Sequence, residues 1–438
     1  MSDKARDLLV RGVAAAKAND VDEARFFLEW VLRTESSLEQ RADAFFWLGE
    51  ISSDPEEKRG YLSEALACRP NHYQAQRSLA VLDGRLDPQD IIDPDMLQPQ
   101  LSNQQGEASA QRFVCQNCGG RLTYTPDGRS LTCEYCSRRK EVAETGLEQN
   151  QDMNPYDFTI AMATAKGHIH PISTRTMECQ ACGAVFVLAP ETVSLTCPYC
   201  AAVYVVDQTE TRHLLPPQGI IPFTVTETLA RKLLLSWSNH HKLPVNIRLT
   251  PPRGLYFPAW VFSISGPLPW ECSVPNDNNW EGSINENWQP LSGIELVAQD
   301  DVVVPASRTA PKNWVTRLHD YNLDALVPYE ASYLADWPAE SYQISVSDAS
   351  LDARQLVLIK TRKALSEKIP FLYKNLHLDS KDLLVESFQL VLLPIWISSY
   401  HQAGKQHPII VNGQTGNVWG SRPKRGVRNW LSSLFKDN

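Results

Sequence analysis

Eight of the ten cysteines in this 438-residue chain stand in four C-x2-C pairs, a spacing that is typical of metal ligands. The pairs form two quartets of the form C-x2-C-x14-C-x2-C: Cys115, Cys118, Cys133 and Cys136, then Cys179, Cys182, Cys197 and Cys200. Every cysteine of the second quartet follows its counterpart at the same interval, and half of the positions in the two windows are identical. This match indicates a duplicated module.

The spacing within each quartet predicts a closed tetrahedral site. Two residues between cysteines allow a tight turn that points both thiolates at one ion, and the glycine after Cys118 and Cys182 tolerates positive φ. Four thiolates leave no open position for a substrate. Because a module of this size has almost no core, metal binding would supply its folding energy. We expect two structural Zn²⁺ ions. Rubredoxin-like iron and redox-active cysteine pairs are the alternatives.

The stretch between the two pairs of each quartet is long enough for one β-hairpin, which places the second turn opposite the first. Turn-forming residues occupy both expected hairpin tips, at 125–128 and 189–192. The sequence therefore predicts two small β zinc ribbons, at 112–140 and 176–207.

Residues 1–86 have apolar positions at helical spacing in paired segments. Asp20 and Glu23 predict the start of the second helix. Gly12 with Ala24, and Gly49 with Leu62, resemble the tetratricopeptide pattern, in which small residues let paired helices approach closely. A plain bundle of helical hairpins is the alternative. We expect a tetratricopeptide-like domain that ends in a single capping helix near 73–82.

The rest of the chain divides by composition. Polar and proline-rich stretches predict linkers at 87–111 and 141–175. β-rich runs alternate with helices expected at 226–242 and 348–368, so 213–421 reads as an α+β domain with a mainly antiparallel sheet. The whole chain is thus a multidomain α+β protein.

Periodicity also predicts which faces of the two helices are buried. On the first helix we expect Leu229, Leu233 and Trp237 to face the core, and on the second Leu351, Leu358 and Leu365. Two strands share a Pro-x-Trp centre, FPAW at 257–260 and LPIW at 393–396, which suggests an internal duplication.

Bulk properties narrow the function. The net charge of −9 disfavours general binding to nucleic acid or membranes. The N-terminus lacks the features of a signal peptide, and paired cysteines suit a reducing compartment, so we expect a cytoplasmic protein. No P-loop, GxGxxG, HExxH or GxSxG motif occurs. An enzyme with an unrecognised site in the C-terminal domain is retained only as an alternative.

Two local features argue for other partners. The first ribbon carries an excess of basic residues that would suit nucleic acid: Arg112, Arg121, Arg129, Arg138, Arg139 and Lys140. The second ribbon is acidic on balance, which weakens a shared nucleic-acid role. The tail 422–438 combines basic and apolar residues, a pattern that also occurs in helices at membrane surfaces.

The paired ribbons, followed by IIPF, GLYFPAW, ALVPYE and IIVNGQTGNVWG, resemble a group of bacterial zinc-ribbon proteins over about residues 112–421. These proteins are labelled by similarity to TFIIB-type ribbons or to the zinc region of the PriA primosomal helicase. The resemblance implies zinc at both quartets, whereas the downstream motifs are fold signatures. The chain has no helicase motifs, so that activity is not implied.

Taken together, the sequence predicts a non-enzymatic zinc-binding adaptor or scaffold. Its helical repeats would bind a protein partner, zinc would brace the ribbons, and the C-terminal domain would offer a second surface. A nucleic-acid-associated factor in replication or transcription, acting through the first ribbon, is the main alternative.

Overall fold

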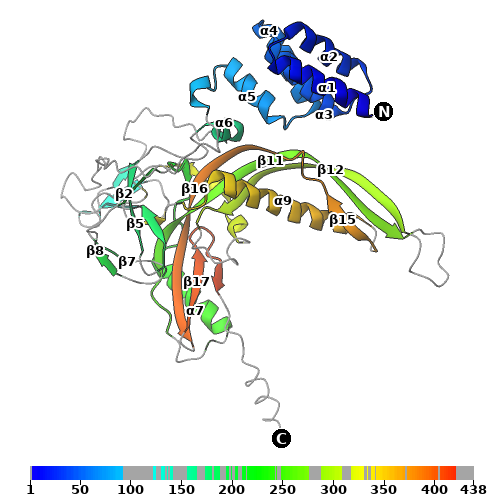
Figure 1. The fold of residues 1–438 in the computed structure, drawn as a ribbon. Coiled ribbons are helices and arrows are strands. Elements are labelled where there is room, and N and C mark those ends of the chain that lie inside the picture. The colour runs from blue at the N-terminus through cyan, green and yellow to red at the C-terminus, as the bar shows by residue number, and fades with distance from the viewer. Residues whose placement is uncertain are drawn as a thin grey trace, which may run out of the picture.

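The computed structural model combines N-terminal helices with a large, mostly antiparallel sheet in the C-terminal half, which confirms the mixed α+β class (Figure 1). The structure describes residues 2–91, 155–164, 173–179, 182–187, 215–241, 248–275, 288–307, 317–329, 337–340, 342–369, 372–402 and 405–420, residues 243 and 333, and short pieces within 122–141 and 194–213.

Five helices form the N-terminal layer, and their bounds are α1 Ser2–Lys17, α2 Val21–Arg33, α3 Leu38–Ile51, α4 Pro55–Cys68 and α5 Tyr73–Leu82. Polar caps fix where they begin. The Asp20 side chain accepts a hydrogen bond from the Glu23 backbone N–H, so the predicted start of α2 is confirmed. Ser37 and Gln40 form a reciprocal capping box at α3.

Glycine lets neighbouring helices approach closely in this layer. A Cβ placed on Gly12 of α1 would lie 2.8 Å from Leu28 of α2, and one on Gly49 of α3 would lie 3.3 Å from Leu62 of α4. Leu28 and Leu62 are themselves fully buried. The small residues that the sequence pattern singled out therefore lie at helix–helix contacts.

A large sheet dominates the rest of the structure. Its long strands are β11 Arg253–Pro275, β12 Trp288–Pro305, β16 Leu384–Gln402 and β17 Lys405–Asn412. The shorter members are β4 Tyr156–Asp157, β5 Ser173–Glu178, β6 Val185–Val187, β9 Glu210–His213, β10 Gly219–Ile220, β13 Val327–Pro328, β14 Ala339–Glu340, β15 Lys374–Leu378 and β18 Val418–Gly420. β11 and β16 pair antiparallel at the centre, while β12 and β17 flank them as hairpin partners.

Two helices cover the sheet, α7 Glu227–His240 and α9 Val346–Lys368, close to the predicted ranges. Their buried faces differ in part from the prediction. Leu229 and Leu351 are exposed, whereas alanines such as Ala349 and Ala353 are fully buried. A small side chain lets the helix axis come close to the sheet, and larger residues are then displaced to the flanks.

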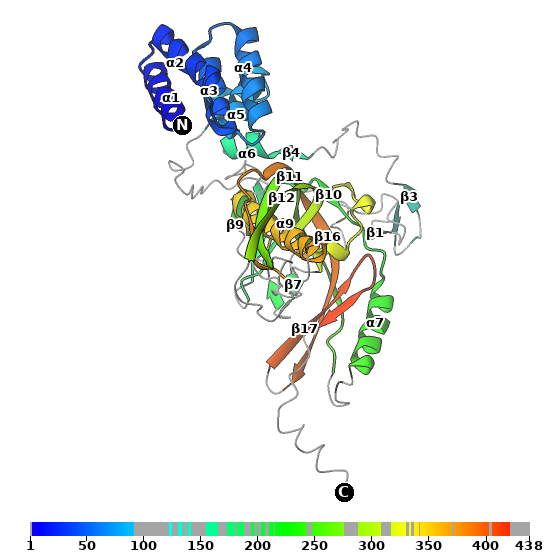
Figure 2. The ribbon, with the colours of Figure 1, turned by 90° about the vertical axis from the view of Figure 1, so that its right-hand side faces the viewer.

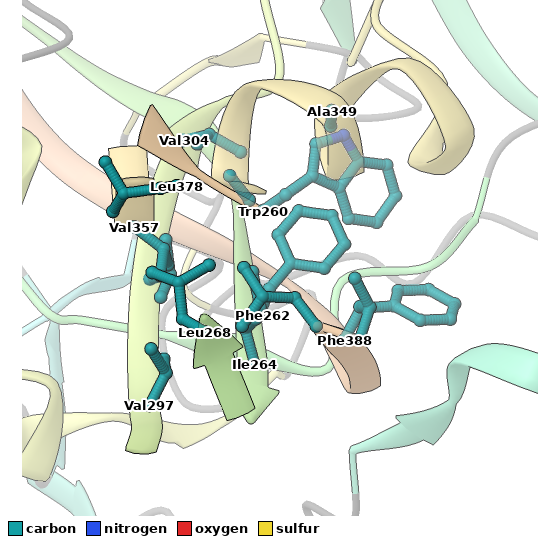
Figure 3. Packing of buried hydrophobic residues seen from close by; sticks show 14 of the residues in the cluster. Trp260, Phe262, Ile264, Leu268, Val297, Val304, Ala349, Val357, Leu378 and Phe388 are labelled. Carbon is teal, nitrogen blue, oxygen red and sulfur yellow. The ribbon is translucent and has the colours of Figure 1, made fainter. Parts of the chain in front are cut away.

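The main core lies between α9 and the β11–β12–β16 surface (Figure 3). Trp260 and Phe262 of β11 are fully buried there and meet Phe388 of β16, with the Trp260 and Phe388 ring centroids 5.9 Å apart. Ala349 and Val357 of α9 close the cluster from the opposite side. Burial of this apolar surface provides the main stabilisation of the C-terminal half.

Part of the predicted linker 141–175 is structured. β4 pairs with β16, and α6 Phe158–Ala163 follows at once, with Asp157 as its N-cap. Thr164 forms an isolated bridge with Ile91, and α6 contacts α5, so this segment joins the helical layer to the sheet (Figure 2). A helix this short leaves no visible periodicity in a sequence.

The short helical elements of the C-terminal half are 3₁₀ turns, η5 Leu318–Asp320 and η6 Leu323–Ala325, while η1 Pro88–Asp90 follows the N-terminal helices. No helix among the described residues is both long enough and apolar enough to span a membrane.

Substitution of Gly12 by valine should destabilise the helical layer by about 1–3 kcal/mol, because the added atoms collide with Leu28. Gly60 of α4 is the matched control, since a Cβ there meets nothing within 4 Å. Gly60→Ala should stabilise by roughly 0.5–1 kcal/mol through helix propensity. Urea unfolding followed by far-ultraviolet circular dichroism measures both. Equal effects of the two variants would contradict the close helix contact.

Candidate metal centres on a duplicated sheet

The described residues at the first turn of the second quartet make the backbone hydrogen bonds of a tight turn. The Cys179 carbonyl accepts a hydrogen bond from the Gly183 N–H at 2.7 Å, and the Cys179 N–H donates to the Ala184 carbonyl at 2.8 Å. Gly183 has φ +74°, as the sequence predicted for the residue after Cys182. The hairpin of β5 and β6 continues the turn on both sides.

Cys133 and Cys136 of the first quartet lie in or next to a separate three-stranded sheet of β1 Leu122–Tyr124, β2 Ser130–Cys133 and β3 Arg139–Glu141. β1 pairs with β2 in the predicted hairpin, and Leu122 lies opposite Cys133. Cys133 therefore ends β2, and the exposed Cys136 lies in the turn that leads to β3.

The strands of the two quartets correspond closely. In the second quartet β6 Val185–Val187, β7 Ser194–Thr196 and β8 Val203–Val205 stand at sequence positions similar to those of β1, β2 and β3. β7 pairs with β8 as β2 pairs with β3, but the described partners of β6 are β5 and β14, whereas β1 pairs with β2. β7 and β8 begin after β2 and β3 at the same interval that separates the two sets of cysteines. The sequence repeat is thus accompanied by a repeat of strand positions.

These features fit the expected zinc, although the ligand sets themselves stay predictions. Cys115, Cys118, Cys197 and Cys200 lie outside the described residues. Within the described part of the chain, no group of three or more His, Cys, Asp or Glu residues is placed to bind a metal. What supports zinc is the thiolate donor set and the knuckle backbone at Cys179.

Part of the second ribbon belongs to the large sheet: β6 is one of its strands, whereas β7 and β8 form a separate two-stranded sheet. β6 pairs with β14, so that Glu340 lies opposite Phe186, and β5 pairs with β9 beyond it. Cys179 is fully buried in an apolar cluster that includes Leu255 and Phe257 of β11. The sequence predicted this ribbon, at 176–207, as a module separate from the 213–421 domain; β6 lies in the same sheet as strands of that domain, while β7 and β8 do not.

Polar contacts reinforce this attachment. The Tyr199 hydroxyl donates a hydrogen bond to one carboxylate oxygen of Glu340, and the Ser307 hydroxyl donates to the other. Glu340 is only 1% exposed, and the Gln343 side-chain amide donates to the Gly183 carbonyl at 3.3 Å. A buried carboxylate needs such donors because it has lost water.

The large sheet itself has a duplicated plan, as the two Pro-x-Trp strands suggested. In the first copy the Trp260 indole N–H donates to the Ile344 carbonyl at 2.9 Å, just before the N-cap of α9. The Ala306 carbonyl accepts from the backbone N–H groups of Gln343 and Ile344, and the Ala306 N–H donates to the Pro258 carbonyl.

The second copy repeats each of these bonds. The Trp396 indole N–H donates to the Val225 carbonyl at 2.8 Å, just before the N-cap of α7. The Gly413 carbonyl accepts from the backbone N–H groups of Thr224 and Val225, and the Gly413 N–H donates to the Pro394 carbonyl. We call the two networks the Trp260 lock and the Trp396 lock.

The two locks are built from three matching pieces of chain. Pro258 and Trp260 correspond to Pro394 and Trp396, Ala306 corresponds to Gly413, and the segment ending at Ile344 corresponds to the segment ending at Val225. Strand pairing follows the same plan, because β10 runs parallel to β16 and β14 runs parallel to β11. The short repeat noted in the sequence was therefore the visible part of a larger duplication.

The two copies are interleaved. α7 precedes β11 in the chain but packs on β16 and β17, and α9 precedes β16 but packs on β11 and β12. Each lock thus joins a strand hairpin to a helix other than the one that directly precedes that hairpin in the chain. Sequence order alone would have assigned each helix to the hairpin that follows it.

Buried tyrosines surround the locks, and burial raises the pKa of each phenol. Tyr342 contacts Trp260 edge-on with ring centroids 5.2 Å apart, and its pKa rises to about 12. Its oxygen accepts a hydrogen bond from the Leu215 N–H. Burial also raises the pKa of Tyr321, whose hydroxyl donates to the Pro394 carbonyl at 2.8 Å. These groups stay neutral and act as structural donors and acceptors.

The other predicted binding residues are only partly placed. Arg139 and Lys140 belong to β3, opposite Thr132 and Leu131. The remaining basic residues of the first ribbon and the whole tail 422–438 lie outside the described residues. Nucleic-acid binding by the first ribbon and membrane contact by the tail therefore stay predictions.

The equivalence of the locks can be tested by removing one indole N–H at a time. Trp260→Phe and Trp396→Phe should each cost about 1–3 kcal/mol of unfolding free energy, because each leaves a buried carbonyl without its donor. Trp30→Phe, at a partly exposed position in α2, is the control and should cost less than about 0.5 kcal/mol. Urea titration measures all three. A neutral effect at either lock would show that its bond is dispensable.

Zinc content tests the metal centres directly. Purified full-length chain should contain about two zinc ions per chain by inductively coupled plasma mass spectrometry. The double variant Cys115→Ser/Cys118→Ser should lose one of them, because two thiolates do not hold a structural zinc. Iron in place of zinc, or a metal content that the substitutions do not change, would contradict the predicted sites.

Comparison with known proteins finds a distant relative. The chain is 25% identical over 346 residues to the uncharacterized protein YdjG of Bacillus subtilis, an alignment that covers 74% of this chain and 93% of that protein. No family model matches the chain, and no solved structure matches it. The similarity therefore extends over most of both chains and comes without a described activity.

Proposed function

We propose that this protein is a cytoplasmic, non-enzymatic adaptor that holds two structural zinc ions and binds a protein partner through its N-terminal helices. The helices would recognise the partner, the first ribbon would be a second binding module, and the duplicated sheet would hold both. Thiolate ligands suit a reducing compartment, which supports the proposed location.

The observation that carries this proposal is an exposed aromatic pair on α2. Phe26 is 60% exposed and Trp30 41% exposed, one helical turn apart, with ring centroids separated by 5.6 Å. The Lys4 ammonium lies 5.5 Å from the Trp30 ring. Aromatic side chains with a flanking cation are typical anchors of protein interfaces. Large parts of both rings face solvent, so a protein partner could bury them.

Polar contacts join the helical layer to the sheet and would fix its orientation relative to the C-terminal half. Arg85 pairs with Asp157 at 3.4 Å, and the Thr159 hydroxyl donates to the Gln76 side-chain oxygen at 2.8 Å. The Asn71 side-chain amide donates to the Lys381 carbonyl, just before β16 begins. A partner bound to α2 would thus be held in a defined orientation toward the C-terminal half, as an adaptor requires.

The test is affinity purification of the tagged full-length chain from its native cells. The variant Phe26→Ala/Trp30→Ala should reduce recovery of a specific partner at least about tenfold, because anchor residues of this kind contribute roughly 2 kcal/mol or more. Tyr73→Ala is the matched control, since Tyr73 is an exposed aromatic on α5, away from the pair. It should leave recovery unchanged.

Circular dichroism of each variant would show whether the helices remain folded. Unchanged partner recovery with the folded Phe26→Ala/Trp30→Ala variant would contradict recognition through α2. Deletion of the helical layer with no loss of partners would contradict the adaptor function of the helices as a whole.

A further inference from the structure

The two locks differ at two neighbouring positions, and both lie where the second ribbon attaches. Glu340 precedes Ile344 in the Trp260 lock, and Ser307 follows Ala306. At the same spacing from Val225 and from Gly413, the Trp396 lock has Ile221 and Gln414. Ile221 is 1% exposed and lies in an apolar cluster. A buried carboxylate therefore takes the place of a buried isoleucine only in the copy that carries the ribbon.

The partner of this carboxylate belongs to the metal-binding module. Tyr199 stands between Cys197 and Cys200 in the second C-x2-C pair, and its hydroxyl donates to Glu340. A side chain between two ligands depends on the metal for its position, because the metal holds the turn together. The contact is thus a direct connection from the second knuckle to β14.

From Glu340 the connection continues into the Trp260 lock within a few residues. Gln343 and Ile344 follow in the chain and donate to the Ala306 carbonyl. The next residue after Ala306 is Ser307, whose hydroxyl donates to Glu340. The carboxylate is therefore bonded to both segments that form the lock, just before α9 begins at Val346.

We propose that the second metal centre is a metal-sensitive conformational switch, in which Tyr199, Glu340 and Ser307 form a latch that couples metal occupancy to the start of α9. The inference rests on the proposed zinc binding. With metal bound, Tyr199 donates to Glu340 and the Trp260 lock is closed. When the metal leaves, the knuckle loosens, Tyr199 withdraws, and Glu340 is left in the core without one of its donors.

The switch is driven by the cost of leaving the Glu340 carboxylate buried without one of its hydrogen-bond donors, a cost that the Trp396 lock does not have. A buried carboxylate that loses a hydrogen-bond donor is destabilised, and access to water would replace the lost donor. Because β14 is short and Glu340 ends it, hydration of the carboxylate requires β14 to separate from β6. Separation disturbs the N–H groups of Gln343 and Ile344 that hold the lock. The Trp396 lock has isoleucine in place of the carboxylate and carries no ribbon, so it stays closed.

Site-resolved hydrogen exchange on the full-length chain tests the switch, with metal removed by a chelator such as EDTA. Metal removal should accelerate exchange at the Gln343 and Ile344 amides about tenfold or more, the consequence of one lost charge-assisted hydrogen bond. The Thr224 and Val225 amides, which make the equivalent bonds in the Trp396 lock, are the internal control and should be unchanged. Equal acceleration in both locks, or in neither, overturns the proposal.

Two variants separate the latch from general loss of structure. Tyr199→Phe removes only the hydroxyl and should accelerate both exchange at Ile344 and release of one zinc ion to the chelator. Tyr135→Phe is the matched control, because Tyr135 holds the same place between the last two cysteines of the first quartet. It should change neither. If the two variants behave alike, the latch is wrong.

The result is also distinguishable from failure of the proposed function. A chain that contains no metal before chelation contradicts the zinc sites themselves. A chain that contains two zinc ions but shows unchanged exchange at Gln343 and Ile344 contradicts the switch alone. Partner recovery through Phe26 and Trp30 depends on neither outcome.

Discussion

A buried indole N–H needs an acceptor, and in this protein that need positions both helices of the C-terminal half. Trp260 and Trp396 are almost completely buried, so neither N–H reaches water. Each finds the last carbonyl before a helix N-cap, at Ile344 and Val225. Because the cap residue that follows fixes the start of the helix, one hydrogen bond determines where the helix lies on the sheet. The apolar side chains under α9 and under α7 then pack against each helix in the place that this bond gives it.

Interleaving of the two copies makes the sheet one cooperative unit. α7 completes the hairpin of β16 and β17, and α9 completes that of β11 and β12, so neither half of the chain can bury its core alone. The long antiparallel pairing of β11 with β16 adds a second connection between the halves. A module attached to one lock can therefore affect a helix that lies far from it in sequence. The second ribbon occupies such a position through β14.

The sequence predicted those features that local chemistry determines. Apolar periodicity located α7 and α9 closely, and the FPAW and LPIW repeat marked the centres of both locks. It could not reveal which helix covers which hairpin, because both helices are amphipathic and either pairing buries them. Ala349 and Ala353 were missed as core residues since alanine carries little hydrophobic signal until a close approach makes it necessary. The same applies to Glu340, whose burial depends on donors from two distant segments.

The two cysteine quartets show that one sequence motif can be attached to the rest of the protein in different ways. The second ribbon packs against the large sheet: β6 pairs with β14, Cys179 is buried in one cluster with Leu255, and the Tyr199 hydroxyl donates a hydrogen bond to Glu340. The first ribbon has its own three-stranded sheet and lies in a stretch of chain whose ends are joined by the bridge between Ile91 and Thr164. Among the described residues the first ribbon pairs only within its own three-stranded sheet, whereas β6 of the second ribbon completes part of the large sheet, so two modules with the same cysteine spacing are attached to the protein in different ways.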